Sequence, residues 1–517
     1  MRKEEYEKET GLQLKEIGEI IDPEPLLNDE LYDLGLWMAR QTVSYNITCF
    51  QSMLPNKIKP KSNRKKAVME YYIELVDASK ATSNRQKQAV EQLREGPMKR
   101  SEFNKKYPGI YGVLFDRGAI KTVSREKEGE YSALDIRPAG YPLTRQQREA
   151  IEKINNTDKS VILLHGLTGS GKTEVYMQLA QQKCLEGKQV LILVPEISLT
   201  PQMVTRMTNR FGNNIAIYHS KLNDQERYEQ YQLVKKHQVK IVVGTRSAIF
   251  MPFDNLGLIV LDEEHDHSYK QDSTPRYYCR DVAIYRGRYH GCKVVLGSAT
   301  PTLESYARAI KGVYELVELR KRIFQNLPSS HLIDMQKETR KGNLILSEDL
   351  KKAIGNRLAK NEQCILLLNR RGYTPIMRCR QCNEVIQCPH CDIAMSYHKD
   401  DNILMCHTCG YTTNADVECP NCGANSWFHY GVGTQRLYET VQQEFPEARI
   451  LRMDADSVRK KGGHRDILES FERHEADILL GTQMIAKGLD YPDVTLVGIF
   501  NADALLARTD YRSVEVT

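Results

Sequence analysis

The sequence of 517 residues predicts an α/β protein with two lobes, each built around a parallel β-sheet. Three observations support this fold class. Short apolar runs alternate with helical patterns through the middle of the chain. A glycine-rich loop joins one of these runs to a helical stretch. The alternation restarts near residue 363, where a cysteine-rich insertion soon interrupts it. A chain of this length exceeds what one hydrophobic core sustains, so several domains are expected.

The glycine-rich loop has the pattern of a P-loop. It follows the apolar run Val161–Leu164 and precedes a helix-forming stretch that starts at Glu174. Such glycines let backbone N–H groups curl around phosphate oxygens, and the helix N-terminus adds a favourable dipole. Lys172 would reach the β- and γ-phosphates, and Thr173 would ligate Mg²⁺. The expected nucleotide-binding residues are Gly166, Leu167, Thr168, Gly169, Ser170, Gly171, Lys172 and Thr173.

An acidic strand end complements the P-loop. The apolar run Leu258–Leu261 continues into Asp262, Glu263, Glu264 and His265. Asp262 suits a Mg²⁺ partner, and Glu263 suits the base that orients the attacking water. We therefore expect Lys172, Asp262 and Glu263 to be the catalytic residues.

The remaining apolar runs complete the two sheets. In the first lobe they are Val190–Val194, Lys240–Val243 and Lys293–Leu296, with helical patterns between them. This order predicts a parallel sheet covered on both faces, with Gly297–Thr300 beside the γ-phosphate. The second lobe has no P-loop of its own, so nucleotide is expected in a cleft between the lobes, as in a helicase-type motor. Its strand candidates are Gln363–Leu368, Ala448–Leu451, Ala476–Leu480 and Val494–Phe500.

The insertion in the second lobe predicts zinc. Eight of the 13 cysteines form four Cys-x-x-Cys pairs within 44 residues, the spacing of tetrahedral thiolate sites. A disulfide framework is the alternative, but such frameworks belong to short secreted chains. The eight cysteines are Cys379, Cys382, Cys388, Cys391, Cys406, Cys409, Cys419 and Cys422.

Loop lengths favour two nested zinc sites. The second and third pairs are separated by 14 residues, the length of a zinc-ribbon hairpin, and would share the inner metal. The first and fourth pairs would close an outer site. A sequential order would join the first two pairs across only five residues, which is tight for two knuckles facing one metal. Three nearby histidines are then spare, namely His390, His398 and His407.

Composition and charge are less specific. No apolar run approaches the roughly 18 residues of a membrane span, and no leader resembles a signal peptide. We expect a soluble, intracellular protein with no membrane partner. The net charge of +6 is mild and does not by itself indicate nucleic acid. The basic stretch Lys57–Lys66 predicts an exposed linker, which either contacts phosphates or is merely solvated.

The region from residue 67 to 136 predicts a small winged-helix-like unit. Helical patterns cover Gln86–Arg94 and Met98–Tyr107, and a third, Ile110–Val123, runs into a strand. Such a unit either binds DNA or packs against protein. A DNA-binding edge would include Lys99, Arg100, Lys105 and Lys106.

Several of these motifs resemble those of superfamily 2 helicases. The motif that starts at Asp262 resembles a DEAH-like box. With eight cysteines inserted in the second lobe and Gly431–Gln435 after them, the chain is similar, from about residue 11 onward, to the PriA family of primosomal replication-restart helicases. The other motifs are Val194–Gln202 (motif Ia), Val243–Ala248 (motif Ib), Gly297–Thr302 (motif III) and Leu480–Gly488 (motif V).

The resemblance implies a fold and a function. The fold is two RecA-like helicase lobes with a double-zinc insertion in the second, preceded by a winged-helix-like domain and a partial N-terminal DNA-binding domain. The function is that of an ATP-dependent 3′–5′ DNA helicase that recognises forked DNA and initiates replication restart by primosome assembly. ATP, Mg²⁺ and two Zn²⁺ are the implied cofactors. Forked and single-stranded DNA, single-stranded-DNA-binding protein and primosome components are the implied partners, in the bacterial cytoplasm at the nucleoid.

The resemblance also implies roles for further residues. Gln147 would read adenine upstream of the P-loop. The aromatic-rich stretch that ends at Tyr278 would couple DNA contact to hydrolysis, since aromatic faces and guanidinium planes stack on bases. The alternative is that its tyrosines are ordinary core or surface residues. The implied DNA-binding residues are Thr245, Arg246, Tyr269, Arg276, Tyr277 and Tyr278.

The expected domains are residues 1–62 (partial N-terminal DNA-binding domain and linker), 67–136 (winged-helix-like), 140–316 (lobe 1) and 317–517 (lobe 2, incomplete), with zinc-binding residues 377–426 inside lobe 2. The family begins with a β-rich domain, of which residues 11–60 would be the latter part. It also continues into motif VI, whose arginine this chain lacks, and Arg508 and Arg512 are expected to be surface cations. Slow ATP hydrolysis follows, so a fork-binding scaffold with little or no helicase activity is the alternative function. An ATPase acting on RNA is disfavoured by the zinc insertion.

Overall fold

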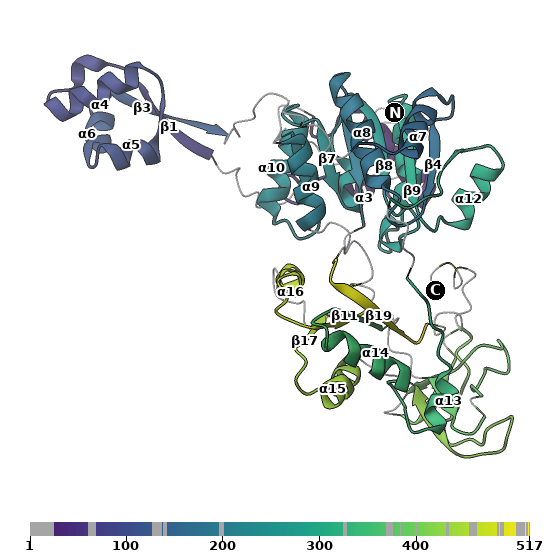
Figure 1. Cartoon of the computed structure of the whole chain (residues 1–517). Helices are drawn as coiled ribbons and strands as arrows, with labels where there is room; N and C mark the ends of the chain where they lie inside the picture. The colour runs from purple at the N-terminus through teal and green to yellow at the C-terminus, as the bar shows by residue number, and fades with distance from the viewer. Residues whose placement is uncertain are drawn as a thin grey trace, which may run out of the picture.

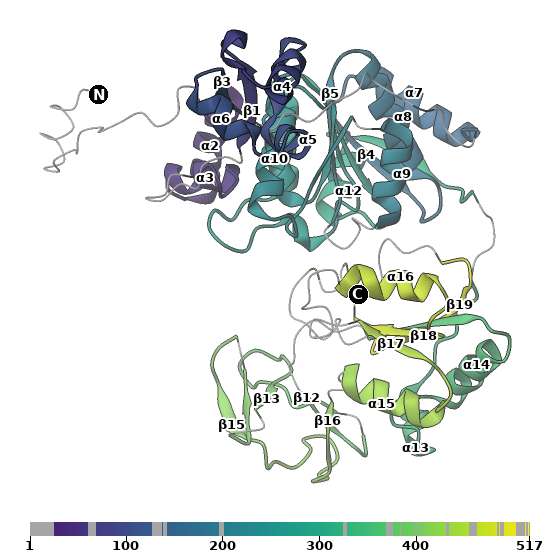
Figure 2. The same ribbon diagram turned by 90° about the vertical axis from the view of Figure 1, so that its left-hand side faces the viewer.

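The computed structural model describes residues 25–59, 69–126, 137, 142–195, 201–212, 214–323, 328–368, 376–382, 384–398, 401–406, 408–430, 434–453, 463–482, 485, 491–502, 512 and 515. Four sheets organise them, belonging to a small N-terminal unit, lobe 1, lobe 2 and the cysteine-rich module (Figures 1 and 2). The segment 196–200 of motif Ia and most of motif V lie outside this part of the chain. No helix within it is long and apolar enough to cross a membrane.

Lobe 1 contains a seven-stranded parallel sheet in the order β10-β4-β9-β8-β5-β7-β6. The five strands expected from apolar runs are confirmed. The two edge strands, β6 and β10, were not predicted: β6 is an apolar run of only four residues, and β10 has glutamates at two of its five positions. The bounds are β4 (Val161–Gly166), β5 (Gln189–Leu193), β6 (Ile215–Tyr218), β7 (Ile241–Gly244), β8 (Leu256–Leu261), β9 (Lys293–Ser298) and β10 (Glu315–Leu319).

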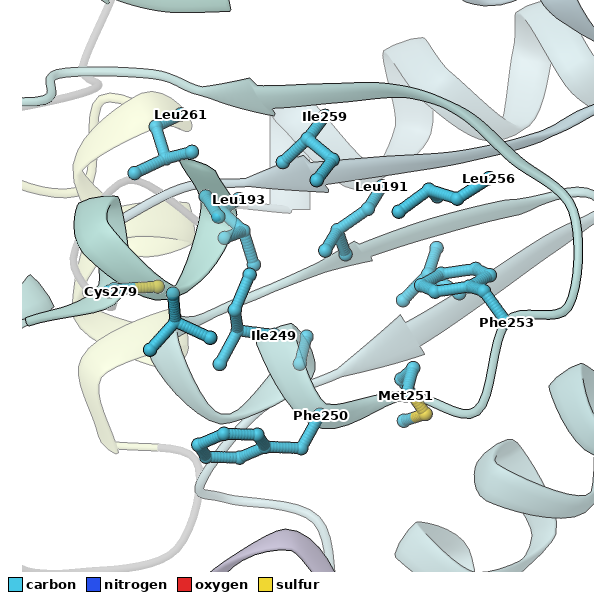
Figure 3. Close-up of a cluster of buried hydrophobic side chains, with 14 of the residues drawn as sticks. Leu191, Leu193, Ile249, Phe250, Met251, Phe253, Leu256, Ile259, Leu261 and Cys279 are labelled. Atoms are coloured by element: carbon cyan, nitrogen blue, oxygen red, sulfur yellow. The ribbon is translucent and has the colours of Figure 1, made fainter. Parts of the chain in front are cut away.

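Helices cover both faces of this sheet, as predicted. Successive residues of β5 point to opposite sides: Val190 and Ile192 enter one core, and Leu191 and Leu193 enter the other. Figure 3 shows the second core, where Leu191 lies near Leu256 and Leu193 lies near Leu261. The first face is covered by α7 (Arg145–Asn156), α8 (Lys172–Leu185) and α9 (Pro201–Phe211). The second is covered by α2 (Asp29–Thr42), α3 (Asn46–Met53), α10 (Asp224–Lys235) and α11 (Cys279–Tyr289).

Helices α2 and α3 correct an expectation. Residues 11–60, expected to be the latter part of a β-rich domain, contain two helices and no strand within the described range 25–59, and these helices pack into the core of lobe 1. Leu31, Leu34 and Met38 are fully buried there, at the spacing of one helix face. The buried Glu30 carboxylate accepts a hydrogen bond from Arg286 of α11 at 2.6 Å. Residues 60–66 of the basic stretch lie outside the described residues.

The small N-terminal unit has the expected three helices, and the third is followed by the expected strand, β3. Its antiparallel sheet has the order β2-β1-β3, and Ile73, Phe103 and Leu114 lie in its core. The second predicted helix begins with a short strand, and the third ends at Asp116 because the chain turns through Gly118 at a φ of 64°. The elements are β1 (Met69–Leu75), α4 (Asn84–Arg94), β2 (Met98–Lys99), α5 (Arg100–Lys106), α6 (Ile110–Asp116) and β3 (Ile120–Glu126).

Lobe 2 contains a second parallel sheet, in the order β17-β18-β11-β19. All four strands were predicted. Their bounds are β11 (Gln363–Leu368), β17 (Ile450–Met453), β18 (Ile478–Gly481) and β19 (Val494–Phe500). The helices of this lobe are α13 (Met335–Arg340), α14 (Glu348–Leu358), α15 (Thr434–Glu444) and α16 (Gly463–Glu472).

The cysteine-rich module interrupts lobe 2 between β11 and α15. It is a five-stranded antiparallel sheet in the order β15-β14-β13-β12-β16. Figure 2 shows it beside the lobe 2 sheet, on the side of α15. The strands are β12 (Ile376–Cys379), β13 (Ser396–His398), β14 (Ile403–Met405), β15 (Thr412–Asn414) and β16 (Trp427–Tyr430).

Candidate nucleotide site and metal centres

The P-loop connects the carboxyl end of β4 to the first residue of α8, as the sequence predicts. Gly169 and Gly171 have φ values of 78° and 83°, which only glycine adopts without strain. The buried ammonium of Lys172 donates to the Gly166 carbonyl at 2.8 Å. The buried hydroxyl of Ser170 has no hydrogen-bond partner among the described residues. An unsatisfied donor and a buried cation at a helix N-terminus fit a bound phosphate.

Gln147 lies against this loop. It is buried, and it closes the capping box of α7, in which its side-chain oxygen accepts the Thr144 N–H at 2.8 Å. Its side-chain nitrogen donates to the Gly171 carbonyl at 3.2 Å. A Cβ on Gly171 would lie 2.2 Å from that nitrogen. Gln147 therefore joins α7 to the P-loop in this structure, and its reading of adenine stays a prediction.

The acidic box follows β8 and faces the P-loop. The Tyr176 hydroxyl and the Glu263 N–H each donate a hydrogen bond to Oδ1 of the Asp262 carboxylate, both at 3.1 Å. Burial raises the pKa of Asp262, while the nearby Lys172 ammonium acts to lower it. Glu263 has a φ of 48°, a left-handed conformation that a non-glycine residue keeps only when its neighbours hold it. The predicted catalytic residues thus come together.

Glu264, to which sequence reasoning gave no role, anchors the box to the end of β9. It is fully buried and accepts hydrogen bonds from the Thr302 N–H at 2.7 Å and the Ser305 hydroxyl at 3.0 Å, at the start of α12 (Leu303–Ile310). Burial raises its pKa. His265 contacts the Ser298 hydroxyl at 2.7 Å. The box and the predicted motif III therefore form one hydrogen-bonded unit.

Two of the tyrosines expected to stack on DNA bases are buried. Tyr269 is 1% exposed and Tyr277 is 5% exposed, so neither ring has an open face in this structure. The Tyr269 hydroxyl lies 2.7 Å from the Asp262 carbonyl and 3.0 Å from the Leu193 carbonyl, so its single proton is shared between them. The Tyr269 ring is therefore placed to support the acidic box, whereas Tyr277 packs edge-on against Phe250.

The other expected DNA residues differ in exposure. Arg276 is exposed, and Tyr278 is partly exposed with the Arg280 guanidinium 4.6 Å from its ring centre. Arg246 donates to the Ser268 carbonyl at 3.0 Å, and Thr245 is buried. These residues lie on two segments of lobe 1, after β7 and before α11, and their contact with DNA stays a prediction. Arg512 is not a free surface cation, because it bonds to Glu304 of α12 at 2.6 Å.

The eight cysteines form two groups in the nested order that loop lengths predict. Within each group the four sulfurs lie within 4.8 Å of one another, close to the roughly 3.8 Å edge of a tetrahedron with Zn–S bonds of about 2.3 Å. Neither group includes His390 or His398, and His407 lies outside the described residues. The outer group is Cys379, Cys382, Cys419 and Cys422, and the inner group is Cys388, Cys391, Cys406 and Cys409.

The local backbone prepares these sulfurs for a metal. The Cys382 N–H lowers the pKa of Cys379 to about 6, and the Cys409 N–H lowers the pKa of Cys406 to about 7. Hydrogen bonding with the neighbouring Cys409 raises the pKa of Cys391 to about 12. Four crowded sulfurs, some already favouring the thiolate, fit a divalent cation that would balance their charge. The donor set therefore fits zinc in both groups.

Four family descriptions match this chain. They are "3′DNA-binding domain (3′BD)" over residues 2–55, "DEAD/DEAH box helicase" over 144–309, "PriA DNA helicase Cys-rich region (CRR) domain" over 388–413, and "Helicase conserved C-terminal domain" over 431–513. Together with the P-loop, the acidic box and the two parallel sheets, they define the class: the chain is a superfamily 2 helicase with two RecA-like lobes and a zinc-binding insertion.

Similarity to known proteins gives the family. The chain is 38% identical to the replication restart protein PriA of Bacillus subtilis, covering 98% of this chain and 73% of that protein. It is 43% identical to the PriA of Synechocystis over 78% of this chain and 50% of that protein. This chain belongs to the family of replication restart protein PriA. A structure of RecG bound to a three-way DNA junction covers 73% of the chain at 17% identity and a TM-score of 0.40.

Proposed function

We propose that this chain is an ATP-dependent DNA helicase that moves 3′–5′, recognises forked DNA and initiates replication restart by primosome assembly. The observation that carries the proposal is the meeting of Lys172, Asp262 and Glu263 at the carboxyl ends of β4 and β8. In a parallel sheet these ends share one edge, where ligands bind. The match of residues 2–55 to a 3′DNA-binding domain supports forked or 3′-ended DNA as the substrate.

The residues have distinct roles in this proposal. Mg²⁺·ATP, when bound, supplies the phosphoanhydride bond whose hydrolysis drives movement. Lys172 would hold the phosphates, with the P-loop N–H groups around them. The Thr173 hydroxyl and the Asp262 carboxylate would hold the Mg²⁺. Glu263 would orient the attacking water and accept its proton. The two zinc ions would be structural, because each group of four cysteines leaves no ligand position open.

The DNA side of the proposal rests on lobe 1. Arg276 is exposed on the segment that joins the acidic box to α11, and the buried Tyr269 of the same segment contacts the Asp262 carbonyl. DNA held by Arg276 could therefore act on the nucleotide site through a short, packed path. Single-stranded-DNA-binding protein and primosome components are the proposed protein partners, and the nucleoid is the proposed place of action.

The test compares nucleic acids and polarities. ATP turnover would be measured with single-stranded DNA, with single-stranded RNA and with none, and unwinding would be measured on forks carrying only a 3′ or only a 5′ tail. We expect DNA, and not RNA, to stimulate ATP turnover, and we expect unwinding only of forks with a 3′ tail. Both activities should be absent in Lys172→Ala. Equal stimulation of ATP turnover by RNA, or unwinding of forks that carry only a 5′ tail, would contradict the proposal.

A further inference from the structure

Tyr176 is a buried hydroxyl at the nucleotide site that the roles above do not use. It lies on α8, four residues after Lys172, and is fully buried. Its hydroxyl donates to Asp262 Oδ1 at 3.1 Å, across 86 residues of sequence. Among the described residues, Tyr176 is the side chain that donates a hydrogen bond to that carboxylate. A buried tyrosine hydroxyl usually has a partner, and here the partner is the expected metal ligand.

The surrounding backbone keeps this hydroxyl in place. A Cβ on Gly297, the first residue after the apolar part of β9, would lie 1.6 Å from the Tyr176 oxygen. The hydroxyl therefore fills the space where any other residue would carry its side chain. The Glu264 N–H bonds to the Gly297 carbonyl at 3.0 Å, so the same glycine also fixes the acidic box. The Tyr176 hydroxyl thus lies between Gly297 and the Asp262 carboxylate.

The two hydrogen bonds on Oδ1 have a consequence for the other oxygen. The Tyr176 hydroxyl and the Glu263 N–H both occupy Oδ1. A carboxylate with one oxygen held in this way cannot rotate freely, and it presents Oδ2 in a fixed direction. Ligands to Mg²⁺ must meet near-ideal octahedral geometry, so a pre-oriented oxygen binds the ion better than a rotating one.

We propose that Tyr176 is a positioning residue that holds Asp262 through Oδ1 and thereby directs Oδ2 at the Mg²⁺ of Mg²⁺·ATP. The proposal rests on the role of Asp262 in the proposed function. It assigns Tyr176 no contact with nucleotide. Its loss should therefore weaken the contribution of the metal to nucleotide binding and leave metal-free nucleotide binding intact.

The experiment measures the affinity of the full chain for a fluorescent ATP analogue, once with Mg²⁺ and once with EDTA. The dissociation constant in EDTA divided by that in Mg²⁺ gives the contribution of the metal to nucleotide affinity. In Tyr176→Phe the ratio should fall by about tenfold, the size expected for one hydrogen bond to a charged group. The dissociation constant in EDTA should be unchanged, and raised Mg²⁺ should restore the affinity.

Tyr231→Phe is the matched control, because that buried tyrosine of the same lobe donates to the Leu26 carbonyl at 3.0 Å, on the face of the sheet away from α8. Tyr231→Phe should keep the wild-type ratio of dissociation constants, although we expect it to lower the melting temperature about as much as Tyr176→Phe does. Asp262→Asn distinguishes the positioning role of Tyr176 from the metal-binding role of Asp262. If Asp262→Asn loses the Mg²⁺ effect and Tyr176→Phe keeps it, the positioning proposal is overturned and the proposed function stands. If both keep it, the metal role of Asp262 also fails.

Discussion

Removal of Glu30 should detach the N-terminal helices from lobe 1. Glu30 of α2 and Arg286 of α11 form a bidentate pair, with Nη2–Oε2 at 2.6 Å, and exposures of 2% and 0%. Arg286 also donates to the Met251 carbonyl at 3.0 Å, just beyond the predicted motif Ib. In Glu30→Ala the guanidinium stays buried without its counter-charge. That is the costly way to break a buried pair, since the uncompensated charge cannot reach water.

The size of the effect follows from this burial. Breaking one side of a buried ion pair costs about 3–5 kcal/mol of unfolding free energy. For a unit of lobe 1's size each kcal/mol lowers the melting temperature by about 2–4 °C, so a loss of about 6–20 °C is expected. Burial raises the pKa of Glu30, but the charge of Arg286 and the hydrogen bonds from His290 and Arg286 together outweigh burial, and the pKa lies below the ordinary 4.5. The stabilisation by the Glu30–Arg286 pair is therefore fully present above pH 4.5, and it is lost as the pH falls through the folded-state pKa of Glu30.

The assay is thermal melting by circular dichroism at neutral and acidic pH, with hydrogen exchange of peptides from residues 25–58. Glu30→Ala should melt lower at pH 7, exchange faster in that segment, and approach the wild type as the pH falls through the lowered folded-state pKa of Glu30. Glu149→Ala is the matched control, because its pair with Arg145 is exposed and should contribute nothing measurable. A neutral-pH melt equal to the wild type, or a gap that persists in acid, would refute the reasoning.

Three further outcomes are expected. Lys172→Ala should abolish DNA-stimulated ATP turnover while fluorescence anisotropy shows unchanged DNA affinity without nucleotide; loss of that affinity would mean that the sites are not separate. Metal analysis should find two zinc ions per chain, and about one in Cys388→Ser, because the outer four cysteines form a separate group; two ions in that variant would contradict the grouping. Gly297→Ala should lower both the melting temperature and ATP turnover, since its methyl group would collide with the Tyr176 hydroxyl; wild-type turnover would argue against the tight contact.

Much of the fold could be predicted because the central strands of both parallel sheets are buried on both faces. Such strands are continuous apolar runs, and every one predicted in the two lobes is present. The cysteine groups could be predicted because ligand spacing within one short segment limits the possible pairings. The edge strands β6 and β10 could not, since β6 is very short and the glutamates of β10 interrupt its apolar pattern.

The supporting residues were missed for a different reason. Tyr176 lies in the apolar stretch of α8 and has the pattern of an ordinary core residue, and its contact with Asp262 joins segments 86 residues apart. Likewise Glu30 and Arg286 are 256 residues apart and have no local signal. The helical spacing of Leu31, Leu34 and Met38 could have corrected the β-rich expectation, because apolar residues three and four apart indicate a helix. Contacts of this kind depend on tertiary structure.

The nested cysteine groups imply an order of assembly. The inner group closes a loop of 14 residues, whereas 36 residues separate Cys382 from Cys419 in the outer group. Closing the longer loop unaided costs about 0.8 kcal/mol more in chain entropy. Once the inner zinc is bound, however, it closes the chain between Cys382 and Cys419 into a shorter effective loop, which brings the two outer pairs closer together. The inner site should therefore fill first during synthesis and the outer site should empty first under zinc starvation, so that the outer knuckles open and close with metal supply while the hairpin inside them persists.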